Sequence, residues 1–166
     1  MLVNKYLANY PPHVLSQVQQ LIDNAQLADF LQTRHPSSHH ITTDPALRDY
    51  VTSLKSQYMK KSAPLSKVVY DGKIHVLHNA LGLHTYVSRV QGSQLKRKNE
   101  IRIGAVFKKT SEALLQMIVV HELAHLKERE HNKAFYRLCL HMLPEYHQLE
   151  FEMRLHLILW EWQSAR

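Results

Sequence analysis

The sequence is poor in cysteine and has no long apolar run. Its single thiol, Cys139, rules out an internal disulfide framework, and no cysteine cluster is present to hold a structural zinc ion. No stretch approaches the roughly 20 apolar residues that a helix needs to cross a bilayer, and residues 1–15 lack the continuous apolar segment of a signal peptide. We therefore expect a soluble, cytoplasmic protein in a reducing compartment, with no membrane partner.

Acidic residues are scarce in one part of the chain. Between Lys55 and Lys109 there are 12 lysines and arginines but only two carboxylates, Asp71 and Glu100, whereas the rest of the chain is slightly acidic. An uneven charge of this kind favours anionic partners, because the summed surface charge steers association. The alternative interpretation is a solvated, lysine-rich face without a partner.

Internal repeats and low-complexity linkers are also absent, so we expect a single domain over residues 1–166. Its composition is that of an ordinary globular protein, with 45% apolar residues. The patterns of the sequence divide this domain into a helical part over 1–63, a sheet over 64–109 and further helices over 110–166.

Two helices are predicted in the first part. Apolar residues recur at helical spacing over 12–34, and Pro36 ends the pattern. The second helix begins with Asp44 as N-cap and Pro45 at the first helical position, and it extends to about Lys61.

The middle of the chain has the patterns of strands. Residues 68–77 predict a hairpin with a two-residue turn at Asp71-Gly72, and residues 83–90 are rich in β-branched and aromatic side chains. Residues 100–107 alternate between apolar and other side chains. We therefore predict an α+β fold with a small antiparallel sheet of three to four strands.

The last part of the chain is predicted to be helical. Thr110 or Ser111 caps a helix over 112–129, and another helix follows over 133–142. The tail, 146–160, fits both a strand and a helix pattern. We choose the helix because Leu, Glu, Met and Arg dominate there and favour it.

The stretch 117–136, MIVVHELAHLKEREHNKAFY, contains an H-E-x-x-H motif formed by His121, Glu122 and His125. Positions four apart lie on one face of a helix, so the two histidines can bind one metal ion from consecutive turns. Glu122 then lies beside the metal, where it can act on water. The motif therefore predicts a metal-dependent hydrolase.

A third ligand must come from elsewhere. His131 follows ten residues after His121, about 15 Å along an unbroken helix, which is too far for zinc–nitrogen bonds of about 2.1 Å. We therefore expect the chain to bend between Leu126 and Asn132, with Asn132 either in a left-handed conformation or capping a new helix. Glu145 is the alternative third ligand.

The segments 120–127, 131–132 and 135–136 together resemble the signature of YgjP-like metallopeptidase domains, and they are similar to the related SprT-like and WLM groups. The resemblance implies a compact zincin-like α+β fold. In that fold a small antiparallel sheet packs on the helix that carries the motif, and helices flank it at both ends.

The same resemblance implies the role of individual residues. His121, His125 and His131 would bind one zinc ion per chain, and Glu122 would be the general base. Phe135 would pack behind the site.

Several substrates are consistent with these patterns. The leading hypothesis is a metallopeptidase that acts on a peptide or protein through zinc-activated water, with Tyr136 and Tyr146 as candidates to stabilise an oxyanion. Residues 88–93, SRVQGS, depart from the R-W-G-S-C-like stretch of longer relatives, so the resemblance does not by itself imply the substrate preference of those relatives. The alternative is a nucleotide (nucleoside triphosphate) pyrophosphatase, since the basic segment would attract that anionic substrate.

A third hypothesis is an SprT-like protease that associates with nucleic acid through the basic segment 89–109. No helix-turn-helix or aromatic platform accompanies this segment. The residues that would contact the nucleic acid are Arg89, Lys96, Arg97, Lys98, Arg102, Lys108 and Lys109.

Overall fold

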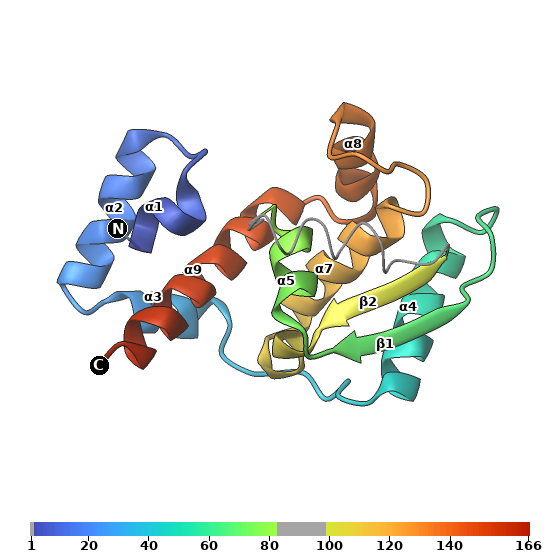
Figure 1. Ribbon diagram of the computed structural model, residues 1–166, viewed down its shortest axis with the longest axis horizontal. Helices are drawn as coiled ribbons and strands as arrows, with labels where there is room; N and C mark the ends of the chain where they lie inside the picture. Colours follow the sequence, from blue (N-terminus) through green and yellow to red (C-terminus); the bar gives the residue numbers. More distant parts are fainter. Residues whose placement is uncertain (1, 83–98) are drawn as a thin grey trace.

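The computed structural model of the chain describes residues 2–82 and 99–166. Helices α7 (Glu112–Ala124) and α9 (Tyr146–Ser164) contact each other. Together they link the N-terminal helices to the part of the molecule that contains the strands (Figure 1). The remaining elements are α1 (Leu2–Leu7), α2 (Pro12–Asp23), α3 (Leu27–Arg34), α4 (Asp44–Tyr58), β1 (Lys67–Asp71), α5 (Ile74–Ala80), β2 (Glu100–Gly104), a 3-10 helix (Ala105–Lys109) and α8 (Lys133–Met142). Helices α1 and α3 contact α9, whereas β2 and α4 contact α7.

Helix α7 lies at the centre of the hydrophobic core. Apart from Gln116, every residue from Leu114 to Ala124 is buried, including the polar side chains of His121 and Glu122. This burial follows from a sequence that is apolar on all sides, because such a helix must be covered by neighbours around its whole circumference. The motif helix is therefore a rigid support for the side chains that it carries.

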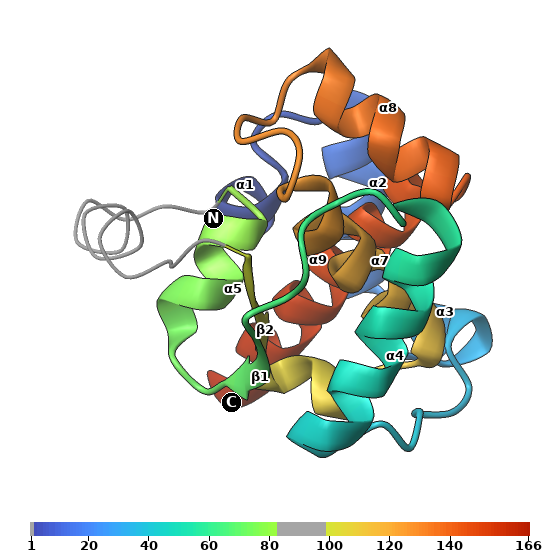
Figure 2. The same cartoon turned by 90° about the vertical axis from the view of Figure 1, so that its right-hand side faces the viewer.

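The sheet differs from the prediction. Strands β1 and β2 pair in parallel, with Lys67 opposite Glu100 and Asp71 opposite Gly104. Within residues 2–82 and 99–166 these are the only two strands, so the antiparallel sheet of three to four strands is not confirmed. Helices α4 and α5 lie on opposite sides of the pair (Figure 2).

The predicted hairpin over 68–77 is wrong, because its second half forms helix α5. The Asp71 carboxylate accepts the backbone N–H of Lys73 at 2.9 Å and turns the chain away from the sheet. A short apolar run does not distinguish a strand from a buried helix, which is why the pattern misled. The strand predicted over 100–107 ends at Gly104, and the one predicted over 83–90 lies outside the described residues.

The helical predictions need smaller corrections. The helix predicted over 12–34 is two helices, α2 and α3, because Ala25 adopts a left-handed conformation with φ 54°. Thr43, and not Asp44, caps α4 by accepting the N–H of Ala46. Asp44 instead accepts the N–H of Tyr70 at 2.9 Å and so ties α4 to β1.

The later predictions agree more closely. Ser111 caps α7, the bounds of α8 are those predicted, and the tail is helical. The helix α1 was not predicted. None of the described helices combines the length and the apolar character that a bilayer-spanning segment needs.

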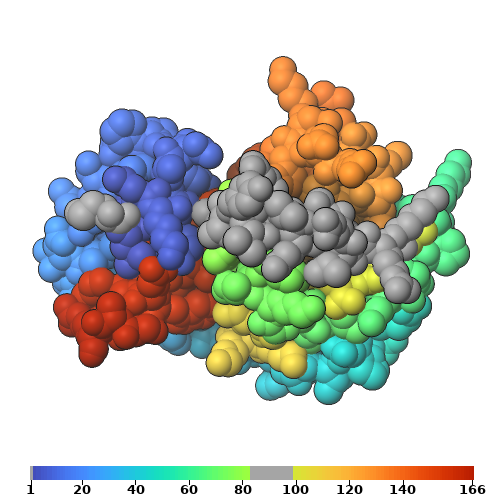
Figure 3. Space-filling model, in the orientation of Figure 1, coloured from blue at the N-terminus to red at the C-terminus, as the bar shows by residue number. Residues whose placement is uncertain are grey.

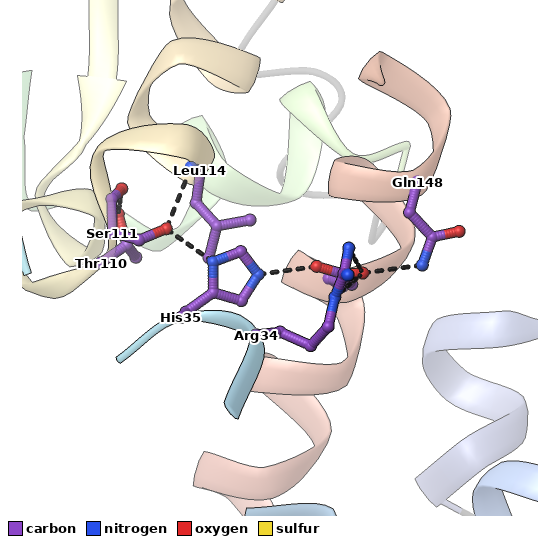
Figure 4. Close-up of polar contacts among 7 residues, drawn as sticks. Arg34, His35, Thr110, Ser111, Leu114 and Gln148 are labelled. Atoms are coloured by element: carbon purple, nitrogen blue, oxygen red, sulfur yellow. Dashed lines mark hydrogen bonds and ion pairs between the residues drawn. The ribbon is translucent and has the colours of Figure 1, made fainter. Parts of the chain in front are cut away.

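A buried polar cluster anchors the first turn of α7 (Figure 4). The carboxylate of Glu152, on α9, is fully buried and accepts hydrogen bonds from His35, Arg34 and Gln148 at 2.7–3.0 Å. The other ring nitrogen of His35 lies 2.7 Å from the hydroxyl oxygen of the helix cap, Ser111. The cluster therefore joins the end of α3, the start of α7 and the middle of α9.

We expect this cluster to make the free energy of unfolding depend on pH in the acidic range. Burial raises the pKa of Glu152, but hydrogen bonds from Gln148, Arg34 and His35 outweigh it and hold the pKa below its usual value. Its contribution is therefore complete above the unfolded-state pKa of about 4.3 and is lost as the pH falls through the folded-state pKa. At neutral pH, Glu152→Gln should lower the free energy of unfolding by about 3 kcal/mol.

Urea unfolding of both proteins between pH 7 and pH 3 measures this difference. The difference in the free energy of unfolding between wild type and variant should become smaller as the pH falls. A difference that stays constant would contradict the lowered pKa of Glu152. Glu145→Gln is the matched control, because Glu145 is exposed at the start of α9 and should contribute no more than about 1 kcal/mol.

Candidate metal centre

The last turn of α7 carries the H-E-x-x-H motif. His121 is 2% exposed, and His125 is the C-cap residue, still in a right-handed helical conformation with φ −67°. The two imidazoles therefore lie one above the other, and their Nε2 atoms are 3.1 Å apart. The expected pairing of positions four apart on one face is present.

The chain then reverses direction before α8 (Figure 2). Helix α7 ends at Ala124 and not near residue 129 as predicted, because the N–H groups of Leu126 and Lys127 bond to carbonyls three residues back, those of Leu123 and Ala124, and so tighten the last turn. Asn132 caps α8: its side-chain oxygen accepts the N–H of Phe135 at 2.9 Å. The predicted bend is therefore present, and Asn132 serves as the cap with φ −99° and not as a left-handed residue.

This reversal brings His131 back to the motif. Its Nε2 lies 3.0 Å from Nε2 of His125. In the described part of the chain, His121, His125 and His131 form a group whose ligand atoms all lie within 4.8 Å of one another. Glu145, the rival third ligand, is exposed at the start of α9 and is not in this group.

Hydrogen bonds behind two of the rings determine which nitrogen carries the proton. Tyr146 donates its hydroxyl proton to the Glu150 carboxylate (2.8 Å), which can only accept, so its oxygen accepts from Nδ1–H of His121 at 2.7 Å. Nδ1 of His125 likewise donates to the backbone carbonyl of Glu128 at 2.9 Å. In its neutral form each of these rings therefore presents the lone pair of Nε2 to the same point.

This donor set fits a bound cation. Lone pairs that face one another at about 3 Å repel unless a positive charge lies between them. Three imidazole nitrogens are a common ligand set for zinc and leave a fourth position for water or substrate, and hydrogen bonds to Nδ1, as at His121 and His125, are typical of such ligands. Cys139 does not compete as a thiolate, since burial and the nearby charge of Glu150 raise its pKa to about 12.

Two further residues complete the immediate surroundings. Phe135 is fully buried, and its ring centroid lies 4.5–4.9 Å from those of all three imidazoles, so it packs behind the site as expected. Glu122 is 7% exposed, and its Oε2 lies 3.9 Å from Nε2 of His121. A carboxylate is thus available beside the point where the three nitrogens converge.

Tyr146, one of the two tyrosines predicted as candidates to stabilise an oxyanion, is buried and contacts His121. Burial, and then the charge of Glu150, raise the pKa of Tyr146 far above its usual value, so the hydroxyl keeps its proton. That hydroxyl bonds His121 and Glu150 and thereby orients a ligand. The sequence alone did not identify the Tyr146–Glu150 pair, although a tyrosine and a glutamate four residues apart on the tail helix were a usable signal.

The residues of the basic segment differ in what the structure describes. Arg89 and residues 96–98 lie outside the described residues. Arg102 forms ion pairs with Asp71 and Glu100, and the ammonium of Lys108 lies over the ring of Tyr70. The association with nucleic acid therefore stays a prediction.

Comparison with known proteins agrees with the resemblance seen in the sequence. Residues 47–156 match the family model described as YgjP-like, metallopeptidase domain. The chain is also 59% identical over 150 residues to the UTP pyrophosphatase of Escherichia coli (strain K12), and the alignment covers 90% of each chain. No solved structure matches the chain.

The choice of third ligand can be tested directly. His131→Ala removes one of three converging nitrogens, so its affinity for zinc should fall by more than about 100-fold, beyond the range seen when only a residue behind a ligand is changed. Glu145→Ala should bind zinc as the wild type does. Competition with a chromogenic chelator measures both affinities, and the reverse order would assign the ligand to Glu145.

The Tyr146 hydroxyl should also affect metal affinity. Tyr146→Phe removes the group that holds Nδ1 of His121, and we expect zinc to bind about 10- to 100-fold more weakly. Tyr70→Phe is the matched control, because its hydroxyl bonds the carbonyl of Ile41, away from the histidines. Equal affinities in the two variants would show that Tyr146 does not orient the ligand.

Proposed function

The chain belongs to the YgjP-like metallopeptidase-domain family, a hydrolase family, and from this premise we propose that it is a zinc-dependent nucleoside triphosphate pyrophosphatase. The reaction would split a nucleoside triphosphate into a nucleoside monophosphate and pyrophosphate. The observation that carries this choice of substrate is the 59% identity, over nine-tenths of both chains, to a protein named UTP pyrophosphatase. UTP is accordingly the first substrate to test.

This proposal reverses the order of the two substrate hypotheses drawn from the sequence. Hydrolysis of a peptide was the leading hypothesis and remains the second candidate, because the matching family model is described as a metallopeptidase domain. The two reactions make similar demands. In each, water attacks an electrophilic centre, carbon or phosphorus, and negative charge develops on the oxygens around that centre.

The three histidines would hold the metal through Nε2, with His121 and His125 kept in the required tautomer by Tyr146 and the carbonyl of Glu128. A zinc ion in this position supplies Lewis-acid stabilisation of the phosphate oxygens and makes water more acidic. Phe135 closes the site from behind.

Glu122 is the chain's own base for this reaction. Its carboxylate, largely shielded from solvent, would take one proton as the water oxygen bonds to phosphorus. The bond between that phosphorus and the bridging oxygen breaks, and the bridging oxygen leaves with its electron pair as part of pyrophosphate. Glu122 then returns the proton to solvent, so that it is ready for another cycle.

A change of this carboxylate should separate binding from turnover. Glu122→Gln keeps the shape of the side chain but cannot take the proton, so kcat for UTP should fall about 10²- to 10⁴-fold while the zinc content is unchanged. Glu130→Gln, the same substitution at an exposed residue of the turn, should keep wild-type kcat. Pyrophosphate release and metal analysis measure the two effects.

The same assay decides between the substrates. Wild-type protein should release pyrophosphate from UTP and leave an unstructured peptide library intact. Cleavage of peptides without pyrophosphate release would contradict the proposed function and restore the peptidase hypothesis.

A further inference from the structure

A cavity of about 610 Å³ opens beside His131, where α1, the end of α5, α8 and α9 meet. In Figure 3 a notch in the outline separates the N-terminal helices, in blue, from α8, in orange. His131 and Tyr136 form part of its wall. A ligand in this cavity would therefore reach the metal centre, and the volume is within the usual range for small-molecule sites.

The wall of this cavity contains two cations, Lys5 and Arg154, and one carboxylate, Glu150. Lys5 is exposed and pairs with Glu161 at the rim. The Arg154 side chain, in contrast, is only 13% exposed. A buried charge without a compensating anion costs more free energy than an exposed one. Of the two cations, Arg154 is therefore the one that gains more from an anionic ligand.

The guanidinium of Arg154 is held in place mainly by neutral groups. It donates to the backbone carbonyls of Tyr6 and Leu81 at 3.0 and 2.6 Å. Its one anionic partner is Glu150, at 3.3 Å, and that carboxylate also accepts the hydroxyl of Tyr146. The Nε atom of Arg154 has no hydrogen-bond partner among the described residues.

These contacts orient the guanidinium before any ligand arrives and compensate its charge only in part. Both N–H groups of Nη2 are engaged and Nε is buried, so the second N–H of Nη1 is the donor that can bond a phosphate oxygen. Resting on the proposed function, we propose that Arg154 recognises the phosphate chain of the nucleoside triphosphate in this cavity. The phosphates would then extend from His131 toward Arg154.

A second hollow on the other side of His131 is a weaker candidate. It is lined by α8 and contains Lys133 and Arg137, without a carboxylate in its wall. Both cations are exposed, so water already solvates them. A phosphate there would replace good hydration, whereas at Arg154 it would add negative charge to a buried guanidinium that shares its one carboxylate, Glu150, with Tyr146.

The test uses the zinc-loaded enzyme and the KM for UTP. Arg154→Gln and Arg154→Lys should raise KM about 10- to 100-fold, the range expected for lost hydrogen bonds to a charged group, with zinc content unchanged. Arg137→Gln, the matched control in the second hollow, should keep wild-type KM. If it raises KM instead and the Arg154 variants do not, the inference is wrong.

Because Arg154 also joins α1 and α5 to α9, its variants can fail to fold, and a second variant avoids this. Asn9 is exposed and lines the same cavity. Asn9→Asp adds a negative charge without disturbing the core and should raise KM about fivefold by repulsion. An unchanged KM in this variant, with active protein, would overturn the inference while the proposed function stands.

Failure of the proposed function can be distinguished from failure of the inference about Arg154. If the proposed function is wrong, the wild type releases no pyrophosphate from any nucleoside triphosphate. In that case calorimetry with inorganic triphosphate tests the cavity by itself. Binding to the wild type that weakens in Asn9→Asp supports the anion site, and absence of binding to the wild type overturns it.

Discussion

The structure depends on the convergence of three imidazole lone pairs at one point. Nε2 of His125 lies 3.0–3.1 Å from Nε2 of both His121 and His131, and bonds behind two of the rings direct those lone pairs inward. This arrangement is favourable only around a cation. It requires α7 to end at Ala124 and the chain to bring His131 back to the motif within seven residues. The bond from the N–H of Lys127 to the Ala124 carbonyl tightens the end of α7, and the side chain of Asn132 caps the start of α8.

Helix α9 supplies the second layer of the site. Tyr146, Glu150 and Arg154 are spaced four apart and so follow one face of the helix, on which the hydroxyl orients His121 and the guanidinium borders the cavity beside His131. Glu152 lies in a separate cluster with His35 and supports the capped start of α7. One helix therefore holds the motif helix at its start and at its metal-binding end.

Local patterns predicted the features that local interactions determine. The motif, the bend before Asn132 and the bounds of α8 follow from spacing and capping, and these were visible in the sequence. The parallel pairing of β1 with β2 was not, because it joins segments about 30 residues apart and the apolar run at 74–77 suits a helix as well as a strand. The roles of Tyr146 and Arg154 depend on how α9 packs against α7 and α1, which no local pattern reveals.

The central claim is that all three imidazoles bind one metal ion through Nε2. X-ray absorption spectroscopy at the edge of the metal that the purified protein carries tests it most directly. The account predicts about three imidazole nitrogens at roughly 2.0–2.1 Å and no sulfur. One or two imidazoles, or a sulfur ligand from Cys139, would contradict it.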